Sequence, residues 1–481
     1  MRNLTMLIDL YELTVADSLF KSGKGETVCY FDLIFRQNPD KGGFVIMAGL
    51  EQAIEYIQNL KFTADDINYL RSKDLSEEFL SYLSRFKFTC DVWAVPEGTP
   101  VFPNEPIVKV KGKAIEAQLI ESMLLLCINH QSLIATKANR LVRAAHGREI
   151  AAFGTRRAQG FDGAVYGARA AYIGGCSAIA NVKSSMDFGI PTLNTMTHSF
   201  VQMYDSEYEA FCDYAKANPE ECSLIVDTYD TVNSGVPNAI KAFDTVLAPM
   251  GIRPKSVRID SGDISYLSQK VRRMLNAGGY PDCDIVASNS LDEYIIRDMM
   301  LHGCKVDCFI VGERLITSAS SPILGCVYKL AAVEENGEQI PKISLSENVS
   351  KITTPASKKV YRLFDMSNGK AIADYLTTED ETVDENEPLE LFDPDFSWKR
   401  KTISRFVARE LLVPIFKGGE LVYKKPSLEE IRTYCAEQVD TLWDEVTRFE
   451  NPHNYYVDLS EKLWNIKNEL LLKYRTGSNK E

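Results

Sequence analysis

The chain has 481 residues, 45% of them hydrophobic and 25% charged, and its formal net charge is −13 at pH 7. This length is too great for one ordinary hydrophobic core, so we expect a globular protein with two or three domains. The acidic balance argues against non-specific binding to nucleic acid, and the apolar runs are too short to span a bilayer.

The first region, from residue 1 to about residue 145, mixes helical and strand patterns. Alternation predicts a strand over residues 26–35, and four prolines and a glycine between residues 92 and 110 separate short apolar runs typical of small twisted strands. Helical spacing predicts helices over residues 11–20, 50–60 and 114–143, the last of them long and buried. We expect a mixed α+β domain here, joined by part of the C-terminal region.

Short apolar strands alternate with helices from residue 146 to residue 325. The strands are predicted over residues 150–153, 178–182, 191–193, 224–226, 257–259, 285–287 and 309–311. The helix after Asp263 repeats its apolar residues with a period of 3.6. This alternation predicts an α/β fold with a parallel sheet, either open or closed into a barrel.

The residues that follow these strands decide between the two kinds of sheet. Small or polar residues follow most of them, including Gly154, Asp227, Asp260, Ser288 and Gly312. In a β/α barrel the C-terminal strand ends share one rim, whereas a doubly wound sheet brings them together only at its switch point. Because the polar residues are spread over so many strands, we expect an irregular β/α barrel that holds the active site.

The last region, residues 326–481, is charged and rich in predicted loops, with an acidic run over residues 378–390. Strand patterns over residues 403–408 and 420–423 precede a helical end. Ser427 and Glu430 form a capping box at the start of an apolar helical stripe. We expect a C-terminal extension of charged loops, short strands and terminal helices.

One stretch concentrates the residue types that carry chemistry. Phe153 suits a flat ring, the adjacent Arg156 and Arg157 suit phosphate or carboxylate, and His198 can transfer a proton or accept a phosphoryl group. Adjacent arginines need not face the same way, so one can bind an anion while the other forms an ion pair. A lone histidine is more often a helix cap or a core residue. The set predicts a site for a phosphorylated, aromatic-acid substrate.

Arg258 and Asp260 lie on and just after a strand that is expected to be buried. A buried arginine needs an anionic partner, which raises the expectation that Arg258 has a function. The structural alternative for the polar residues that follow is a helix N-cap at Ser261 or Asp263. No Walker sequence and no Gly-x-Gly-x-x-Gly occurs.

The 11 cysteines are scattered without a Cys-x-x-Cys pair, which indicates reduced, buried thiols in a cytoplasmic protein. The N-terminus lacks the apolar segment of a signal peptide. The five histidines show no ligand spacing, so we predict no metal site built from protein ligands alone.

Seven segments in a shared order resemble the nicotinate phosphoribosyltransferases, a type II family related to the nicotinamide and quinolinate enzymes. They are residues 9–14, 43–51, 153–158, 195–200, 226–230, 258–263 and 325–329. The resemblance implies an N-terminal mixed domain and an irregular β/α barrel. It also implies a reaction of NAD salvage: nicotinate and 5-phosphoribosyl 1-diphosphate give nicotinate mononucleotide and diphosphate, coupled to ATP hydrolysis.

The resemblance assigns roles around the pyridine ring. Phe153 would stack on one face, and Tyr11 of a neighbouring subunit would cover the other, which implies a homodimer or a larger assembly. Arg258 and the region of Thr195 would hold the nicotinate carboxylate. Ser177 is expected to favour nicotinate, because the related nicotinamide enzyme has an acidic residue at the matching position.

The resemblance also assigns the groups around phosphate. Arg156 or Arg157 would bind phosphate, and Mg²⁺ on the diphosphate would neutralise the leaving group. Asp260 would stabilise the ribosyl cation or order waters of the metal. Glu313 is a departure, since many relatives have a threonine there, and we assign it no role.

His198 matches the family's phosphorylated histidine, with ATP as the phosphoryl donor. Asp227 matches the position whose carboxylate would fix the tautomer of that histidine. Three alternatives stay open: nicotinamide as substrate, quinolinate as substrate, and a non-catalytic barrel that binds a metabolite. Quinolinate carries a second carboxylate and should require more cations than Arg156, Arg157 and Arg258 supply.

Overall fold

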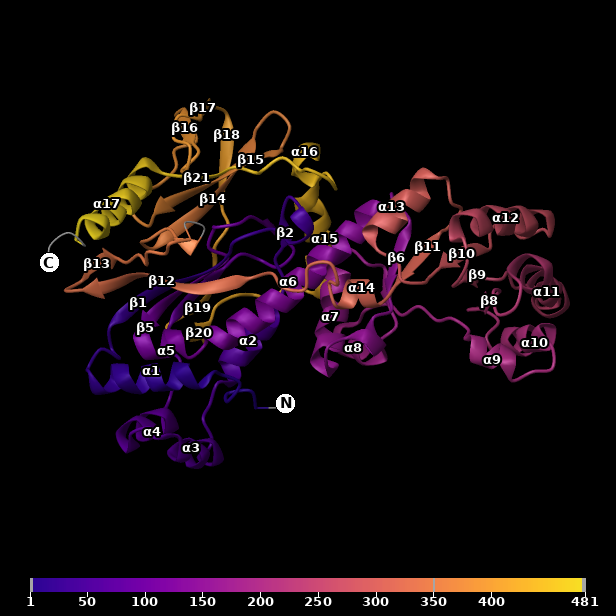
Figure 1. Cartoon of the computed structure of the whole chain (residues 1–481), viewed down its shortest axis with the longest axis horizontal. Helices are drawn as coiled ribbons and strands as arrows, with labels where there is room; N and C mark the ends of the chain where they lie inside the picture. The colour runs from indigo at the N-terminus through magenta and orange to yellow at the C-terminus, as the bar shows by residue number, and fades with distance from the viewer. Residues whose placement is uncertain (1–2, 349–350, 478–481) are drawn as a thin grey trace. The chain divides into compact units, whose positions relative to one another are not determined.

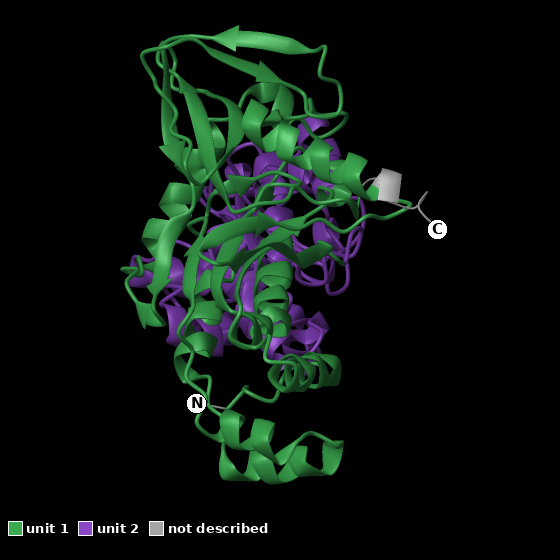
Figure 2. Ribbon diagram, turned by 90° about the vertical axis from the view of Figure 1, so that its left-hand side faces the viewer, with its two compact units in different colours: residues 1–133, 323–481 green, residues 134–322 purple. Residues whose placement is uncertain are grey.

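Strands from both ends of the chain meet in one antiparallel sheet in the computed structural model, which describes residues 3–348 and 351–477 (Figure 1). The chain forms two compact units: the first unit is residues 1–133 with 323–481, and the second unit is residues 134–322 (Figure 2). The sheet of the first unit has the order β13-β12-β1-β5-β3-β19-β20. Its strands are β1 (Val28–Phe35), β3 (Asp91–Ala94), β5 (Val108–Lys113), β12 (Cys326–Glu335), β13 (Glu338–Pro341), β19 (Val413–Lys417) and β20 (Glu420–Leu421).

The predicted N-terminal elements are confirmed with small changes at their ends. The short strands β2 (Val45–Ile46) and β4 (Pro100–Val101) pair with each other, and the helices are α1 (Leu10–Lys21), α2 (Leu50–Asn59), α3 (Ala64–Leu70) and α4 (Glu77–Ser84). The long apolar helix is two helices, α5 (Ala114–Gln118) and α6 (Glu121–Ala144). Residues 114–144 are long and apolar enough to cross a membrane, but 67% of their most apolar window is buried inside the protein, as in a core helix.

The expectation of a loop-rich C-terminal region is wrong for residues 358–378. They form the central strands of a second sheet with the order β18-β14-β15-β21: β14 (Lys358–Asp365), β15 (Ala371–Thr378), β18 (Phe406–Glu410) and β21 (Val457–Leu459). Three charged side chains of the two central strands, Lys358, Arg362 and Asp374, are buried, and each has a partner of opposite charge. Arg362 donates to both carboxylate oxygens of Asp374 at 2.8 and 2.6 Å, and neither side chain is exposed. Lys358 Nζ likewise lies 2.5 Å from Asp32 of β1.

The strand predicted over residues 403–408 is two strands. β17 (Arg400–Ile403) pairs with β16 (Leu389–Phe392), and the chain turns before β18, with Arg405 at a φ of +59°. The capping box is confirmed at the start of α15 (Leu428–Asp440), where Ser427 and Glu430 each accept the other's backbone N–H. Helices α16 (Asp444–Thr447) and α17 (Glu461–Gly477) follow.

The second unit confirms the parallel sheet predicted from its apolar runs. Six parallel strands in the order β7-β6-β11-β10-β9-β8 curl into a half-barrel, and Thr192 extends the β7 edge through one parallel bridge to Ile179. The strands are β6 (Glu149–Ala152), β7 (Ala178–Ile179), β8 (Ser223–Ile225), β9 (Ser256–Ile259), β10 (Asp284–Ala287) and β11 (Cys308–Val311).

Helices connect these strands in the right order for a β/α barrel (Figure 1). The main ones are α7 (Phe161–Ile173), α8 (Val182–Phe188), α9 (His198–Gln202), α10 (Glu207–Ala217), α11 (Val236–Ala242), α12 (Ile264–Ala277), α13 (Glu293–Leu301) and α14 (Glu313–Ile316). Asp263 caps α12 by accepting the N–H of Tyr266 at 3.0 Å, so one of the two expected caps is confirmed. Side chains on one face of the sheet, including Ala151, Val286 and Ile310, form a small apolar cluster.

Candidate active site

The strand register places several predicted site residues in one row. Arg258 pairs with Val286 and with Ile225, and Ala151 pairs with Ile310 and with Ala178, so these residues share one face of the sheet. The residues two positions further along each strand lie on the same face, just past the C-terminal ends of the strands. We call these residues the row: Ala180, Phe153, Gly312, Ser288, Asp260 and Asp227. The shared rim expected from the sequence therefore forms.

His198 faces the row from the first residue of α9. Its Nδ1 lies 3.1 Å from Thr228 Oγ1, and its Nε2 lies 3.7 Å from Asp260 Oδ2 and 4.0 Å from Asp227 Oδ1. Thr197 caps the helix by accepting the N–H of Phe200, which fixes the backbone next to the ring. The imidazole thus has a hydroxyl on one nitrogen and two carboxylates on the other.

Asp227 is the more buried of the two carboxylates, with 2% of its side chain exposed. Its Oδ2 accepts the backbone N–H of Asp260 at 2.8 Å and the hydroxyl of Ser261 at 2.6 Å. Its Oδ1 is buried and forms no hydrogen bond within residues 3–348 and 351–477. A buried carboxylate oxygen without a donor is costly, so this oxygen is available for a proton or a cation near His198.

Arg258 has the anionic partner that its burial requires. It donates from Nη2 to Asp260 Oδ1 at 3.0 Å and from Nε to Ser288 Oγ at 2.9 Å, and its side chain is 14% exposed. Ser288 in turn donates to Asp260 Oδ1. This network fixes the Asp260 carboxylate with its other oxygen toward His198.

Phe153 lies at the end of β6, on the face that carries the other members of the row. Its ring packs beside the apolar cluster, and its N–H donates to Val311 O at 2.8 Å. Between Phe153 and Ser288 the row contains only Gly312, which has no side chain. Adjacent strands are about 4.8 Å apart, so the row has room for a small ring between the aromatic side chain and the Arg258 network.

The adjacent arginines follow Phe153 in a single 3₁₀ turn, Thr155–Arg157, and both are exposed. Arg157 Nε lies 3.9 Å from Glu313 Oε2, and Glu313 also accepts the hydroxyl of Ser290 at 2.8 Å. Glu313 therefore contacts a cation and a hydroxyl of neighbouring loops. Arg156 forms no ion pair with any described residue, so the two arginines do differ in their partners.

The structure does not bring Ser177 to this site. Ser177 precedes β7, and its hydroxyl contacts Glu149 Oε2 at 3.3 Å, at the first residue of β6. It thus lies at the N-terminal edge of the sheet, whereas the row lies just past the C-terminal ends of the strands. The position that β7 contributes to the row is Ala180, so the assignment of Ser177 to the substrate has no support in the geometry. Thr195 lies in the loop that leads to His198, half-buried.

Tyr11 belongs to the first unit. It lies on α1 with 50% of its side chain exposed, and burial together with nearby carboxylates raises its pKa to about 12. Glu121 is the carboxylate with the largest influence on the pKa of Tyr11, and its own pKa is raised to about 7, mainly by burial and then by Glu12. The phenol is therefore neutral at physiological pH.

Two contacts of the site were not predicted from the sequence. Thr228 follows Asp227 directly. Its contact with His198 depends on where α9 lies, and His198, the first residue of α9, is 30 residues earlier in the chain. Ser288 appeared only as one of several polar strand ends, and its link to Arg258 and Asp260 follows from the strand register.

Known proteins resemble this chain over its whole length. Two family models match it: the nicotinate phosphoribosyltransferase (NAPRTase) N-terminal domain over residues 6–129 and the nicotinate phosphoribosyltransferase C-terminal domain over residues 357–467. The chain is 41% identical to the nicotinate phosphoribosyltransferase of Bacillus subtilis (strain 168), with 100% of this chain and 97% of that protein covered. It is 34% identical to the enzyme of Dictyostelium discoideum, with 97% and 88% covered. The crystal structure of human nicotinic acid phosphoribosyltransferase matches with a TM-score of 0.84 at 27% identity, covering 97% of this chain and 100% of that one.

Proposed function

The chain belongs to the nicotinate phosphoribosyltransferase family and is an enzyme of that activity, and we propose that it couples the reaction to ATP through transient phosphorylation of His198. The reaction joins nicotinate to 5-phosphoribosyl 1-diphosphate and gives nicotinate mononucleotide and diphosphate, a step of NAD salvage. The observation that supports the coupling is the placement of the His198 ring between one hydroxyl and two carboxylates.

The surroundings of the ring favour one nitrogen as the nucleophile. The carboxylates of Asp227 and Asp260 stabilise a proton on Nε2, which leaves the lone pair on Nδ1. The Thr228 hydroxyl then donates to Nδ1 in the resting enzyme and must turn away before attack. Nδ1 forms a bond to the γ-phosphorus of ATP as the bond from that phosphorus to ADP breaks, and the proton stays on Nε2. The ring gains positive charge, which the two carboxylates stabilise.

The substrates would use the remaining groups. We propose that Phe153 stacks on the pyridine ring, that Arg258 with the Thr195 loop holds its carboxylate, and that Arg156 or Arg157 binds phosphate. Asp260 is suited to stabilising the ribosyl cation, because its carboxylate is already oriented by Arg258 and Ser288.

Asp227 and Asp260 fit a magnesium ion carried by the diphosphate. No group of three or more metal-binding side chains occurs in the described part of the chain, but Asp227 Oδ1 is buried without a donor and faces the same side as Asp260 Oδ2. These oxygens would hold the ion through its waters. When bound, magnesium would neutralise charge on the leaving diphosphate.

The proposal predicts that His198 is phosphorylated on Nδ1. After incubation with ATP, two-dimensional ³¹P–¹H and ¹⁵N NMR, or antibodies specific for each phosphohistidine isomer, should detect the Nδ1 isomer. His198→Asn should abolish both the modification and the stimulation of turnover by ATP. The control is His302→Asn, at an exposed histidine at the C-terminal end of α13, which should change neither.

An Nε2 isomer would contradict the assignment of the nucleophile. Full ATP stimulation in His198→Asn would refute the phosphorylation of His198. Turnover without ATP, measured in the same variant, shows separately whether the enzyme still transfers the phosphoribosyl group.

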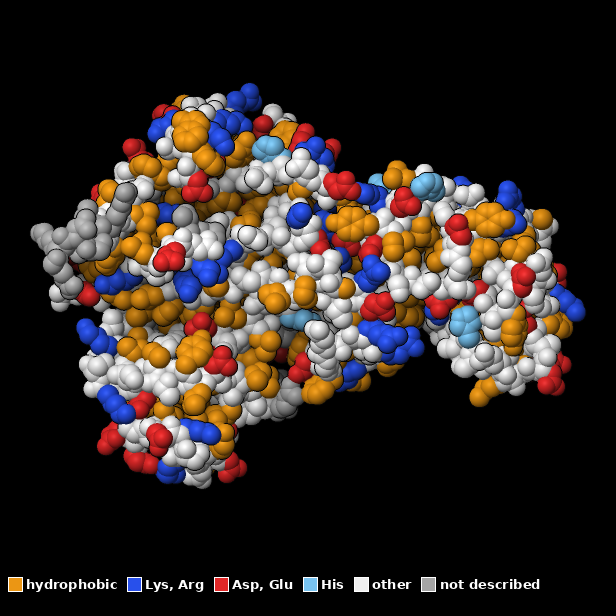
Figure 3. Space-filling view, viewed as in Figure 1, with side chains coloured by type: hydrophobic (Ala, Val, Ile, Leu, Met, Phe, Trp, Pro, Cys, Tyr) orange, Lys and Arg blue, Asp and Glu red, His pale blue; other side chains and the backbone are white. Residues whose placement is uncertain are grey.

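We further propose a cytoplasmic homodimer or larger assembly in which Tyr11 completes the site of a neighbouring subunit. Supporting this, α1 and the residues before it expose a stripe of apolar side chains, and apolar side chains gather around α1 and α2 on the face in Figure 3. The stripe consists of Leu7, Leu10, Tyr11 and Val15, which are 42–51% exposed. An exposed apolar stripe of this kind marks an interaction surface.

Mixed subunits test the shared site. Tyr11→Ala and His198→Ala should each have little ATP-dependent activity alone. After subunit exchange, half the dimers are mixed and one of their two sites is intact, so about a quarter of the wild-type activity should return in a twofold dimer. A mixture no more active than its parents would show that Tyr11 and His198 act within one subunit. Full activity of Tyr11→Ala alone would show that Tyr11 has no role.

A further inference from the structure

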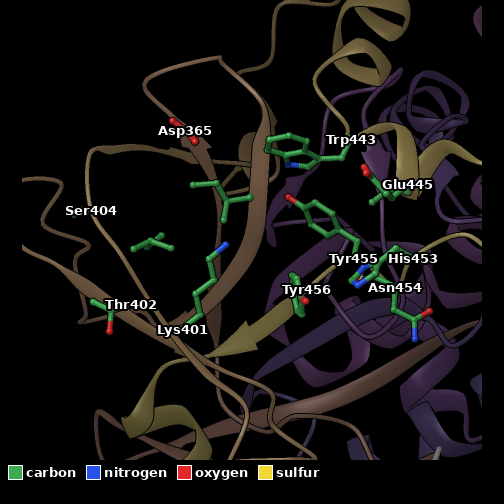
Figure 4. Close-up of a pocket in the computed structure, with 13 residues that line it drawn as sticks. Asp365, Lys401, Thr402, Ser404, Trp443, Glu445, His453, Asn454, Tyr455 and Tyr456 are labelled. Carbon is green, nitrogen blue, oxygen red and sulfur yellow. Dashed lines mark hydrogen bonds between the residues drawn. The ribbon is translucent and has the colours of Figure 1, made fainter.

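A cavity of about 590 Å³ lies in the C-terminal part of the first unit and shares no residue with the row or with His198 (Figure 4). It opens between β17 with its following turn on one side and residues 443–456 on the other. Small-molecule sites in proteins typically measure about 300–1,000 Å³. The cavity is therefore large enough for a ligand the size of a nucleotide.

One wall of the cavity is aromatic. Trp443 and Tyr456 are 39% and 47% exposed, and the ring of His453 lies 5.6 Å from that of Tyr456 in an edge-on arrangement. Figure 4 shows Trp443 and Tyr455 directed toward the space opposite β17. Large aromatic faces left open in a cavity favour stacking of a flat ring.

The base of this wall is held rigidly. The ring of Tyr455 stacks on Phe102 at 3.8 Å, and its hydroxyl donates to Asp374 Oδ1 at 3.1 Å. Asp374 is itself held by the buried Arg362. The cavity is thus preformed, and a ligand would lose little affinity to ordering of the wall.

The opposite wall supplies a cation and aliphatic surface. The side chain of Lys401 extends toward the space in Figure 4, and its ammonium group forms no hydrogen bond or ion pair among residues 3–348 and 351–477. Ile372 and Ile403 lie on the same wall. The nearby Asp365 carboxylate already accepts the N–H and hydroxyl of Ser367 at 2.7 and 2.6 Å, which holds its pKa below the usual value. Lys401 is therefore suited to an anionic ligand group.

We propose that this cavity binds a nucleotide, a ligand that combines a flat aromatic base with a phosphate. The base would lie between the Trp443 and Tyr456 wall and the isoleucines, with its phosphate at Lys401. Glu445, beside Trp443 in Figure 4, can accept an amino group of the base. Because the cavity belongs to a different compact unit from His198, this would be a second ligand site, distinct from the row.

The tryptophan in the wall provides a direct assay. The full-length wild-type enzyme is titrated with AMP, adenosine or ribose 5-phosphate while tryptophan emission is recorded. AMP should quench the emission, and adenosine and ribose 5-phosphate should bind at least about tenfold more weakly, since each lacks one half of the recognised structure. Trp443→Phe should remove the quench, because the other tryptophans, Trp93, Trp398 and Trp464, do not line the cavity.

Matched lysine variants test the phosphate contact. Lys401→Ala should weaken AMP binding by about tenfold or more, the usual size of a charge-assisted hydrogen bond. Lys399→Ala should leave it unchanged, because Lys399 lies on the same hairpin with its ammonium group 4.3 Å from the Phe396 ring and outside the cavity.

The proposal is overturned if millimolar AMP causes no quench, if the quench survives in Trp443→Phe, or if Lys401→Ala binds AMP as well as wild type does. None of these results depends on turnover, so they leave the phosphohistidine proposal untouched.

Discussion

Asp227→Asn is expected to lower the rate of His198 phosphorylation by roughly 10²–10⁴-fold, the usual contribution of a well-placed acid–base group. The amide nitrogen of an asparagine can donate to Nε2, which would move the ring proton to Nδ1 and remove the lone pair from the attacking nitrogen. The amide oxygen can still accept from Asp260 N and Ser261 Oγ, so the fold should be kept. Single-turnover phosphorylation and steady-state turnover with and without ATP would measure the effect.

The matched control is Asp230→Asn, three residues along the same segment. Asp230 is exposed and caps the next helical turn by accepting the N–H groups of Val232 and Asn233 at 3.0 and 2.8 Å. Asparagine caps helices as well as aspartate, so this variant should keep its activity. Equal losses in the two variants, or normal phosphorylation in Asp227→Asn, would show that Asp227 does not control the tautomer.

Arg362→Met should destabilise the first unit by about 3–5 kcal/mol, the cost of leaving a buried charge without its partner. Arg362 is the cation for the buried Asp374. Burial and the Asp374 charge raise the pKa of the neighbouring Glu105, which favours the neutral form of that carboxyl. Urea denaturation followed by circular dichroism would show the loss as a lower midpoint. Replacing both partners, as in Arg362→Met with Asp374→Leu, should recover much of the stability because no charge is then stranded.

An exposed ion pair of the same kind serves as the control. Arg400 and Glu390 lie 2.6 Å apart with about half of each side chain in solvent. Arg400→Met should cost less than about 1 kcal/mol, because solvent screens exposed pairs. A midpoint shift as large as that of Arg362→Met would mean that burial does not govern the effect.

The strands of the half-barrel were predictable because they are buried on both faces. Parallel strands under helices appear as short uninterrupted apolar runs, and residues 285–287 and 309–311 are examples. The C-terminal sheet was missed for the opposite reason. Lys358 and Arg362 gave β14 the appearance of a solvated loop, and only the structure shows that each charge has a buried partner on another strand.

The site was predictable in its members more than in its arrangement. The rule that polar residues follow parallel strands correctly brought Asp227, Asp260 and Ser288 together. Ser177 was misplaced because β7 has only two residues and gave no pattern from which to find its C-terminal end, where Ala180 lies. The carboxylates on Nε2 and the hydroxyl on Nδ1 could not be read from spacing at all.

The first unit is assembled from two stretches of chain that are synthesised far apart in time. In its main sheet β1 lies between β5 and β12, and β3 lies between β5 and β19, so β1 and β3 each lack one neighbour until residues beyond 325 have left the ribosome. The inserted half-barrel has all its own strands between residues 149 and 311 and can be completed earlier. Nascent chains that end near residue 322 should therefore carry a finished half-barrel and an open sheet edge, the species most in need of a chaperone.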